Sequence, residues 1–304
     1  MNRSSRIHLW ITLHRKTTLS HRNQLLKTLE LPPIPAAGQE LLVVINNPDV
    51  EISDLAGAIE KDPGLTARLI GLANSAFFGS RNPIVRVEDA IIKVLGVRMV
   101  KSIAMSLVLS GSLKTNKCEN FSAIEFWKTT LACSQLSRQL CLLSQNKAVA
   151  ADDAYLCGLL HGFGQLLLIH LFPEDMNDLL GVEANQLSRA TLLNAESEAF
   201  DMNECQAGSW VCMRWQLPEF VSTVIRHLDD PEYDGEHKLL IGIIRYALAT
   251  TEAIRNEEEL PTLDPMLLDK LAIDSSRLDK KLDEFIELYN SIETLAKLIS
   301  RINE

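Results

Sequence analysis

Apolar residues recur at helical spacing along most of the chain. Leu65, Leu69 and Leu72 lie three or four residues apart behind Asp62-Pro63, which combines an N-cap acceptor with a proline suited to a first turn. No run alternates apolar and polar side chains as a half-buried strand would. The pattern therefore predicts an all-α fold. The expected helices cover residues 35–45, a segment with Ser53 as N-cap, 63–73, 87–95, 97–109, 124–143, 153–171, 189–198, 203–216, 219–228, 237–254 and 277–302.

The polar stretch from Gly111 to Asn120 is the clearest internal boundary, because it interrupts the apolar periodicity on both sides. We expect four parts: a basic leader over residues 1–22, an N-terminal helical subdomain over 23–115, a second helical subdomain over 116–250, and a charged link with a C-terminal helix over 251–304.

The C-terminal helix has apolar residues spaced alternately four and three apart, which is typical of a coiled-coil seam about three heptads long. Two arrangements would bury this seam. Either the helix packs back on its own domain, or it pairs with a partner helix, including that of a second copy in a homodimer. The seam residues are Leu278, Leu282, Phe285, Tyr289, Ile292, Ala296 and Ile299.

Charge excludes some partners. The chain of 304 residues carries a formal charge of −10, from 30 basic and 40 acidic groups. Such a protein lacks the positive face that nucleic acids and anionic membranes require. Residues 1–22 contain five Arg or Lys residues and no acid, so the rest of the chain carries −15. We interpret this leader as a poorly ordered tail, with a transit peptide as the alternative.

The remaining composition indicates a cytoplasmic protein with no membrane segment, because no apolar run reaches the ~20 residues of a spanning helix. The six cysteines form no CxxC pair and no zinc-finger spacing. We expect them to be reduced, buried and inert, as small hydrophobic side chains.

Motifs for nucleotides or catalytic nucleophiles are absent, including the P-loop, the dinucleotide glycine fingerprint and the GxSxG elbow. The most informative segment is the apolar run Ala154 to Leu168, which contains His161 followed by Gly162-Phe163-Gly164. A histidine in such surroundings needs a hydrogen-bond partner or a ligand.

Several separated motifs together resemble the HDOD family, over roughly residues 23–250. HDOD proteins are bacterial signalling and regulatory modules related to the HD phosphohydrolase superfamily and its HD-GYP branch. The resemblance implies a multi-helix fold with an N-terminal helical subdomain and an HD-like helical subdomain. The motifs are Leu31-Pro32-Pro33-Ile34-Pro35, Asp62-Pro63-Gly64-Leu65-Thr66, Leu72-Ala73-Asn74-Ser75-Ala76-Phe77, Gly158-Leu159-Leu160-His161 with Gly164, and Gly208, Trp215, Leu217-Pro218 and His227.

In that superfamily, His and Asp side chains from several helices bind divalent metals, which lower the pKa of a bound water for attack on a phosphate ester. The resemblance implies that the His-Asp pair reads His161-Gly162 here, and glycine has no ligating side chain. An upstream histidine position falls near Thr129, and a late aspartate position falls near Leu248.

Three possible ligands remain at these positions: His161, His227, and Glu204 where the family has a further histidine. We interpret them as vestiges that hydrogen-bond to each other or to backbone, so that no metal and no cofactor is expected. The alternative is a single divalent metal held by these three residues.

The resulting prediction is a non-catalytic regulatory protein that acts through contacts with signalling proteins. One alternative is a metal-dependent phosphohydrolase or phosphodiesterase on a nucleotide or cyclic dinucleotide. A second is a non-enzymatic sensor of a nucleotide ligand. The segment with Asn74, Ser75, Phe77 and Phe78 is a candidate partner surface, or else a helix-ending turn with its aromatic side chains tucked inward.

Overall fold

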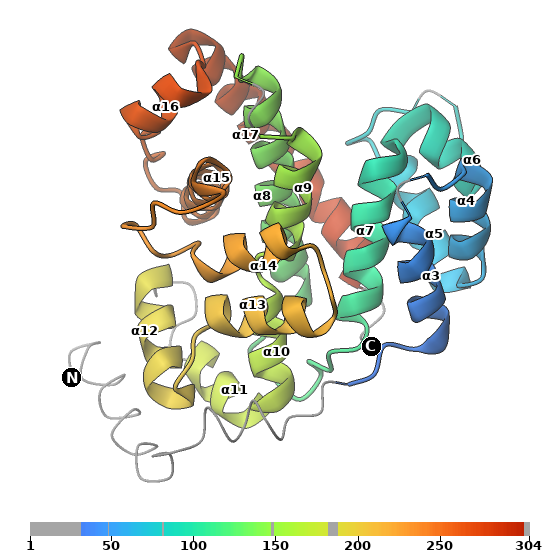
Figure 1. Ribbon diagram of the computed structural model, residues 1–304, viewed down its shortest axis with the longest axis horizontal. Helices are drawn as coiled ribbons and strands as arrows, with labels where there is room; N and C mark the ends of the chain where they lie inside the picture. The colour runs from blue at the N-terminus through green and yellow to red at the C-terminus, as the bar shows by residue number, and fades with distance from the viewer. Residues whose placement is uncertain (1–31, 48, 81, 147–148, 182–187, 301–304) are drawn as a thin grey trace. The chain divides into compact units, whose positions relative to one another are not determined.

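The computed structural model describes residues 32–47, 49–80, 82–146, 149–181 and 188–300 (Figure 1). Helices account for all regular structure in these residues, and they contain no strand, so the all-α prediction is confirmed. The predicted leader, residues 1–22, lies outside them. The helices are α3 (Ala36–Asn46), α4 (Ile52–Glu60), α5 (Pro63–Ala73), α6 (Val87–Ala90), the π-helix η2 (Ile91–Leu95), α7 (Val97–Ser110), α8 (Ala123–Leu143), α9 (Ala151–Leu160), α10 (Phe163–Leu171), α11 (Pro173–Gly181), α12 (Arg189–Phe200), α13 (Glu204–Arg214), α14 (Glu219–Arg226), α15 (Lys238–Asn256), α16 (Pro265–Leu271) and α17 (Ser275–Ser300).

The described chain forms two compact units that alternate along the sequence. Unit 1 contains Leu113–Phe121 and His161–Tyr233, and unit 2 contains Pro33–Ser112, Ser122–Leu160 and the residues from Asp234 onward. Each unit is therefore assembled from separated segments. The linear division into 23–115, 116–250 and 251–304 stays a prediction.

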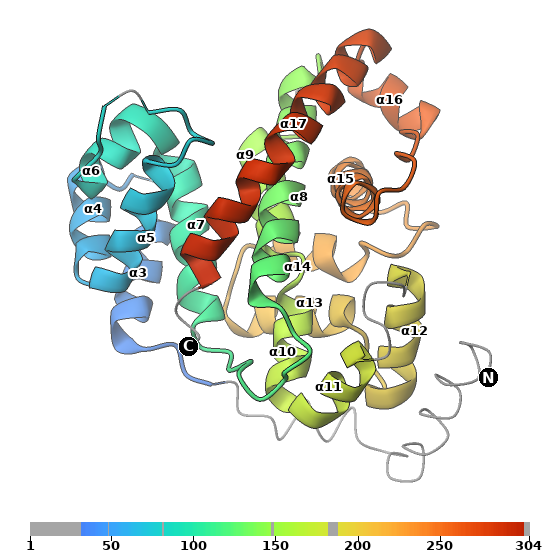
Figure 2. The same cartoon turned by 180° about the vertical axis from the view of Figure 1, so that it is seen from behind.

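In unit 2, α8 is the helix around which others pack: α9, α15 and α17 all contact it. Figure 2 shows α17 running alongside α8. All seven predicted seam residues of α17 are buried, so the prediction that this helix packs on its own domain is confirmed. The possible homodimer through α17 stays a prediction, and it needs a face of the helix other than the buried seam.

Local capping signals gave one correct and one wrong helix start. The Asp62 carboxylate accepts the backbone N–H groups of Gly64 and Leu65 at 2.9 and 3.0 Å, as the Asp-Pro signature predicts. The prediction of Ser53 as an N-cap is wrong. The carbonyl of Glu51 already accepts the N–H of Leu55 at 3.1 Å, so Ser53 lies inside the first turn of α4.

The single helix predicted over residues 153–171 is also wrong, because a turn at His161–Gly162 divides it into α9 and α10. Gly162 has low helix propensity and takes φ −85° and ψ 2° as the N-cap of α10. By length and composition alone, the stretch Ala151–Leu171 could cross a membrane, and in the described residues no other stretch could. However, 83% of its most apolar window is buried inside the protein.

Two glycines near this turn allow helices to approach closely. A Cβ at Gly158 would lie 2.5 Å from the Cα of Ser134 in α8. A Cβ at Gly164 would lie 1.7 Å from the carbonyl oxygen of Glu204 and 2.7 Å from the nitrogen of Gly208, both in α13. Any side chain at either position would overlap backbone atoms, which cannot rotate away.

Replacing Gly164 with alanine is therefore expected to lower the free energy of unfolding by about 3 kcal/mol or more, at or above the upper end of ordinary overpacking. Urea denaturation of the purified chain measures this. The control is Gly57→Ala in α4, where a Cβ meets no atom within 4 Å. That variant should be as stable as the parent or up to ~1 kcal/mol more stable, because alanine favours helix. Equal stabilities of the two variants would contradict the α10–α13 contact.

Candidate functional site

His161 lies in the turn between α9 and α10 and is only 4% exposed. A buried imidazole costs free energy unless its nitrogens have hydrogen-bond partners. The His161 side chain or backbone has at least one interaction partner in the structure. Three residues further on, Gly164 lies against the backbone of Glu204. The close contact of α10 with α13 therefore brings the turn that carries His161 to the start of α13.

Glu204, the second predicted residue, is the first residue of α13 and is 3% exposed. One of its carboxylate oxygens forms an ion pair with the guanidinium of Arg189, at the start of α12. The same guanidinium donates to Cys205 Sγ at 3.5 Å. Arg189 thus supplies a positive charge where the alternative hypothesis placed a metal ion, and the Glu204 carboxylate is already engaged.

A second buried carboxyl, Glu196 of α12, lies beside this pair and has no exposed surface. Its Oε2 accepts the backbone N–H of Glu204 at 2.8 Å. Burial, followed by the negative charge of Glu204, raises the pKa of Glu196 well above its ordinary value. Glu196 therefore keeps its proton to a higher pH than an exposed glutamate does, and this lowers the repulsion between the two neighbouring carboxyl groups.

The sequence analysis did not identify Arg189 or Glu196 as site residues. Both lie within a predicted helix, and nothing in their local sequence distinguishes them from surface charges. The cluster forms only when α12 packs beside the start of α13. The one sequence signal nearby is the Asn203 capping box, which fixes where α13 begins: Asn203 Oδ1 accepts the N–H of Gln206 at 3.1 Å, and Gln206 Oε1 accepts the N–H of Asn203 at 3.3 Å.

His227, the third predicted residue, follows the last turn of α14 and is partly exposed. Its ring stacks on Tyr233, with ring centroids 3.9 Å apart and the planes 20° from parallel. Its Nδ1 lies 3.6 Å from a carboxylate oxygen of Asp230. His227 also lines an open groove between α13 and α14.

The positions predicted to have lost a ligand are distributed over both units. Gly162 is in unit 1, in the turn after His161, whereas Thr129 on α8 and Leu248 on α15 belong to unit 2. Within the described residues, no three His, Cys, Asp or Glu side chains gather in a way that could hold a metal ion. With Glu204 paired to Arg189, the donor set present does not fit the metal centre of the superfamily.

All six cysteines, including Cys205 beside Arg189, are free and buried, as expected. Burial raises the pKa of both Cys205 and Cys212 to about 12. A thiol with so high a pKa is protonated at neutral pH and is a poor nucleophile or metal ligand.

The loop between α5 and α6, which carries the candidate partner residues, is held by side chain to backbone bonds. Asn74 Nδ2 donates to the carbonyl oxygens of Ile70 and Ile84 at 3.0 and 2.7 Å, and its Oδ1 accepts the N–H of Ile84 at 2.8 Å. Ser75 Oγ donates to the Leu72 carbonyl at 2.7 Å. Both polar side chains therefore fix the course of the loop.

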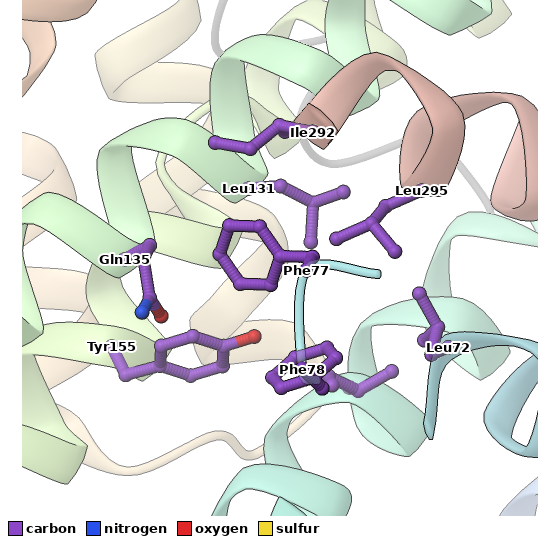
Figure 3. Close-up of a pocket in the computed structure, with 9 residues that line it drawn as sticks. Leu72, Phe77, Phe78, Leu131, Gln135, Tyr155, Ile292 and Leu295 are labelled. Carbon is purple, nitrogen blue, oxygen red and sulfur yellow. The ribbon is translucent and has the colours of Figure 1, made fainter. Parts of the chain in front are cut away.

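The two aromatic residues of this loop point into unit 2 (Figure 3). Phe77 and Phe78 pack edge to face, with ring centroids 5.0 Å apart. They line a cavity that has room for only about 10 Å³ of water, roughly one molecule. The cavity is too small for an organic ligand in this arrangement, and the partner-surface hypothesis stays a prediction. Its other lining residues are Leu72, Ile103, Leu131, Gln135, Tyr155, Ile292 and Leu295.

The sequence matches the HDOD domain over residues 31–231. An uncharacterized protein from Treponema pallidum (strain Nichols) is 27% identical over 249 residues. That alignment covers 82% of this chain and 47% of the Treponema protein, so the chain spans about half the length of this relative.

Solved structures share the fold. A candidate signal transduction protein from Marinobacter aquaeolei VT8 has a TM-score of 0.77 and 25% identity, covering 98% of this chain and 66% of that one. A candidate phosphohydrolase from Shewanella amazonensis SB2B has a TM-score of 0.71 and 21% identity, and the match covers 91% of this chain and 97% of that one. An HDOD domain protein with unknown function from Geobacter sulfurreducens has a TM-score of 0.67 and 19% identity, and the match covers 94% of this chain and 99% of that one. The expected HD-like helical fold is confirmed.

Paired variants test the carboxyl cluster. Glu196→Gln should leave the protein at least as stable as the parent at pH 7, since glutamine can still accept the Glu204 N–H and carries no buried charge. Because the folded pKa is raised, the stabilisation by the bound proton is complete below about pH 4.5 and is lost as the pH rises toward the folded pKa. The variant should therefore lose less stability than the parent between pH 4.5 and 7, measured by urea denaturation.

The contrasting variant is Glu204→Gln, which leaves Arg189 without its counter-charge. We expect it to cost about 2–3 kcal/mol, somewhat below the ~3–5 kcal/mol of a fully buried pair because Arg189 keeps some exposure. If Glu196→Gln were as damaging as Glu204→Gln at pH 7, Glu196 would have to be the charged partner of Arg189.

Proposed function

The chain belongs to the HDOD family, and on that basis we propose that it is a non-catalytic module of bacterial signal transduction, which acts in the cytoplasm through contacts with other proteins. A regulatory role agrees with the description of the Marinobacter structure. The phosphohydrolase relative shares the fold at 21% identity, so its name carries no activity over to this chain.

The observation that carries the proposal is the pairing of Glu204 with Arg189. In a hydrolytic metal centre, carboxylates and imidazoles face a divalent cation that polarises the phosphate and activates water. Here an arginine of the protein occupies the electrostatic role of the cation beside Glu204, and Gly162 replaces the aspartate expected next to His161. An additional cation at this place would be repelled by Arg189.

Several surface properties support a protein partner. The acidic chain is poorly suited to nucleic acid or anionic membrane, as its net charge of −10 indicates. Large apolar side chains are exposed on unit 2, including Val43, Val85 and Ile92. Ile92 belongs to the π-helix η2, a rare element that is often found at functional sites.

The non-catalytic proposal makes a direct prediction that distinguishes it from the metal-dependent alternative. Elemental analysis of the purified full chain should find manganese, iron and zinc well below one equivalent, and added manganese or iron should produce no turnover of a phosphodiester such as bis-p-nitrophenyl phosphate. His161→Ala should leave both measurements unchanged. One equivalent of metal that is lost in His161→Ala, together with phosphodiester turnover, would overturn the non-catalytic assignment.

The protein-contact part of the proposal requires its own measurement. Affinity purification of the full chain from its native cell should recover a defined protein in near-equimolar amount. His161→Ala should recover the same protein, because the proposed contact needs no chemistry at the inherited site. Failure of any protein to co-purify at native abundance, with the chain folded and monomeric, would count against this role.

A further inference from the structure

The C-terminal helix α17 has two halves that differ in how completely they are packed. The first half, residues 275–288, buries Leu278, Leu282 and Phe285, and Phe285 has no exposed surface. In the described part of the chain, none of the polar side-chain atoms of this half is buried without a hydrogen-bond partner. The second half, residues 289–300, combines an unpaired hydroxyl with a void, and we call it the strap.

Tyr289 begins the strap and carries the unpaired hydroxyl. Its side chain is only 4% exposed, and its oxygen is shielded from solvent and has no hydrogen-bond partner among the described residues. A hydroxyl in this position loses its hydrogen bonds to water when the strap packs and regains them when the strap lifts. Tyr289 therefore favours opening of the strap.

The void lies between the strap and the loop after α5. Ile292 and Leu295 line it from α17, and Phe77 and Phe78 line it from the loop (Figure 3). Side chains that border a void lose the dispersion contacts that closely packed atoms would supply on that side. The strap therefore rests on the loop without filling the space between them.

A single positive charge under the strap gives the contact its specificity. The side chain of Lys128 on α8 is only 12% exposed, and its Nζ lies 3.7 Å from Glu293 Oε2 and 4.6 Å from the centroid of the Tyr289 ring. An ammonium group this shielded needs a counter-charge and gains from an aromatic face. A helix that replaced the strap would have to supply the same two groups, an acid and an aromatic ring four residues before it.

We propose that the strap is an autoinhibitory cover, and that an amphipathic helix of a protein partner displaces it to bind the surface formed by α5, α8 and the loop with Phe77 and Phe78. The proposal rests on the protein-contact role proposed above, and it names the partner class and the regulation of that role. A partner meets the free surface only in the open fraction of molecules, so its apparent affinity falls in proportion to that fraction.

A labelled peptide with the sequence of residues 286–300 is the probe, and fluorescence anisotropy measures its binding to the full chain. The peptide should bind the parent chain weakly, and a peptide with Ile292→Asp should not bind. Leu295→Ala in the chain removes contacts of the strap, so the peptide should bind this variant about tenfold more tightly or better. The matched control is Leu282→Ala in the first half of α17, which should leave the affinity unchanged. Equal gains in the two variants, or no binding to a folded Leu295→Ala chain, would reject the strap.

A reversible lock decides the same question on one polypeptide. A Cβ at Gly71 of α5 would lie 3.7 Å from both Cδ atoms of Leu298, so Gly71→Cys combined with Leu298→Cys places two thiols across the contact. The six native cysteines are buried and do not compete. The oxidised chain should bind the peptide about tenfold more weakly than the reduced chain, or not at all. Equal binding in the two redox states, with the disulfide verified by mass spectrometry, would overturn the proposal.

Tyr289→Phe tests the unpaired hydroxyl directly, because it removes only the oxygen. In the chain it should weaken peptide binding severalfold, since the strap closes more firmly. In the peptide the same change should strengthen binding severalfold. The opposite pair of effects would show that the hydroxyl stabilises the closed strap, which contradicts the proposed bias toward opening.

The lock also separates this proposal from the role on which it rests. Both redox states of the double-cysteine chain are incubated with a lysate of the native cell. If they recover the same partner in equal amount, the protein-contact role stands and the strap is rejected. If no partner is recovered while the peptide behaves as described, the strap stands as a helix-binding device and the protein-contact role fails.

Discussion

The backbone contact between α10 and α13 is the constraint on which unit 1 depends. With no Cβ at Gly164, the two helices approach until Gly164 touches the Glu204 carbonyl and the Gly208 nitrogen. Gly208 in turn lies close to Ile225 of α14. Two glycines therefore set the separation of three helices, and with it the depth at which Glu204 is buried.

Burial at that depth decides the electrostatics of the candidate site. A carboxylate away from water needs a nearby cation or proton, and the chain provides both: Arg189 for Glu204, and a raised pKa for Glu196. In the HD superfamily a metal ion meets the same need. The two solutions differ in chemistry, because a guanidinium neutralises charge but cannot lower the pKa of a bound water as a metal ion does.

Features encoded by neighbouring residues could be predicted from the sequence, and features created by packing could not. The Asp62-Pro63 helix start and the buried seam of α17 follow from spacing alone, and both agree with the structure. The break at His161–Gly162 was missed, because the apolar residues around it continue the helical pattern through the turn. Arg189 and Glu196 were missed, because their function arises only where α12 meets α13, a contact that no local pattern encodes.

The interleaved order of the two units has a consequence for how the chain folds during synthesis. The apolar faces of α8 are completed by α17, which a ribosome makes roughly 130 residues later, or about 7–26 s at ordinary elongation rates. Unit 1 draws most of its residues from one continuous stretch that emerges in between. A nascent chain thus carries an incomplete unit 2 while most of unit 1 has already been made, and during that interval the faces of α8 that α15 and α17 later cover have no partner helix.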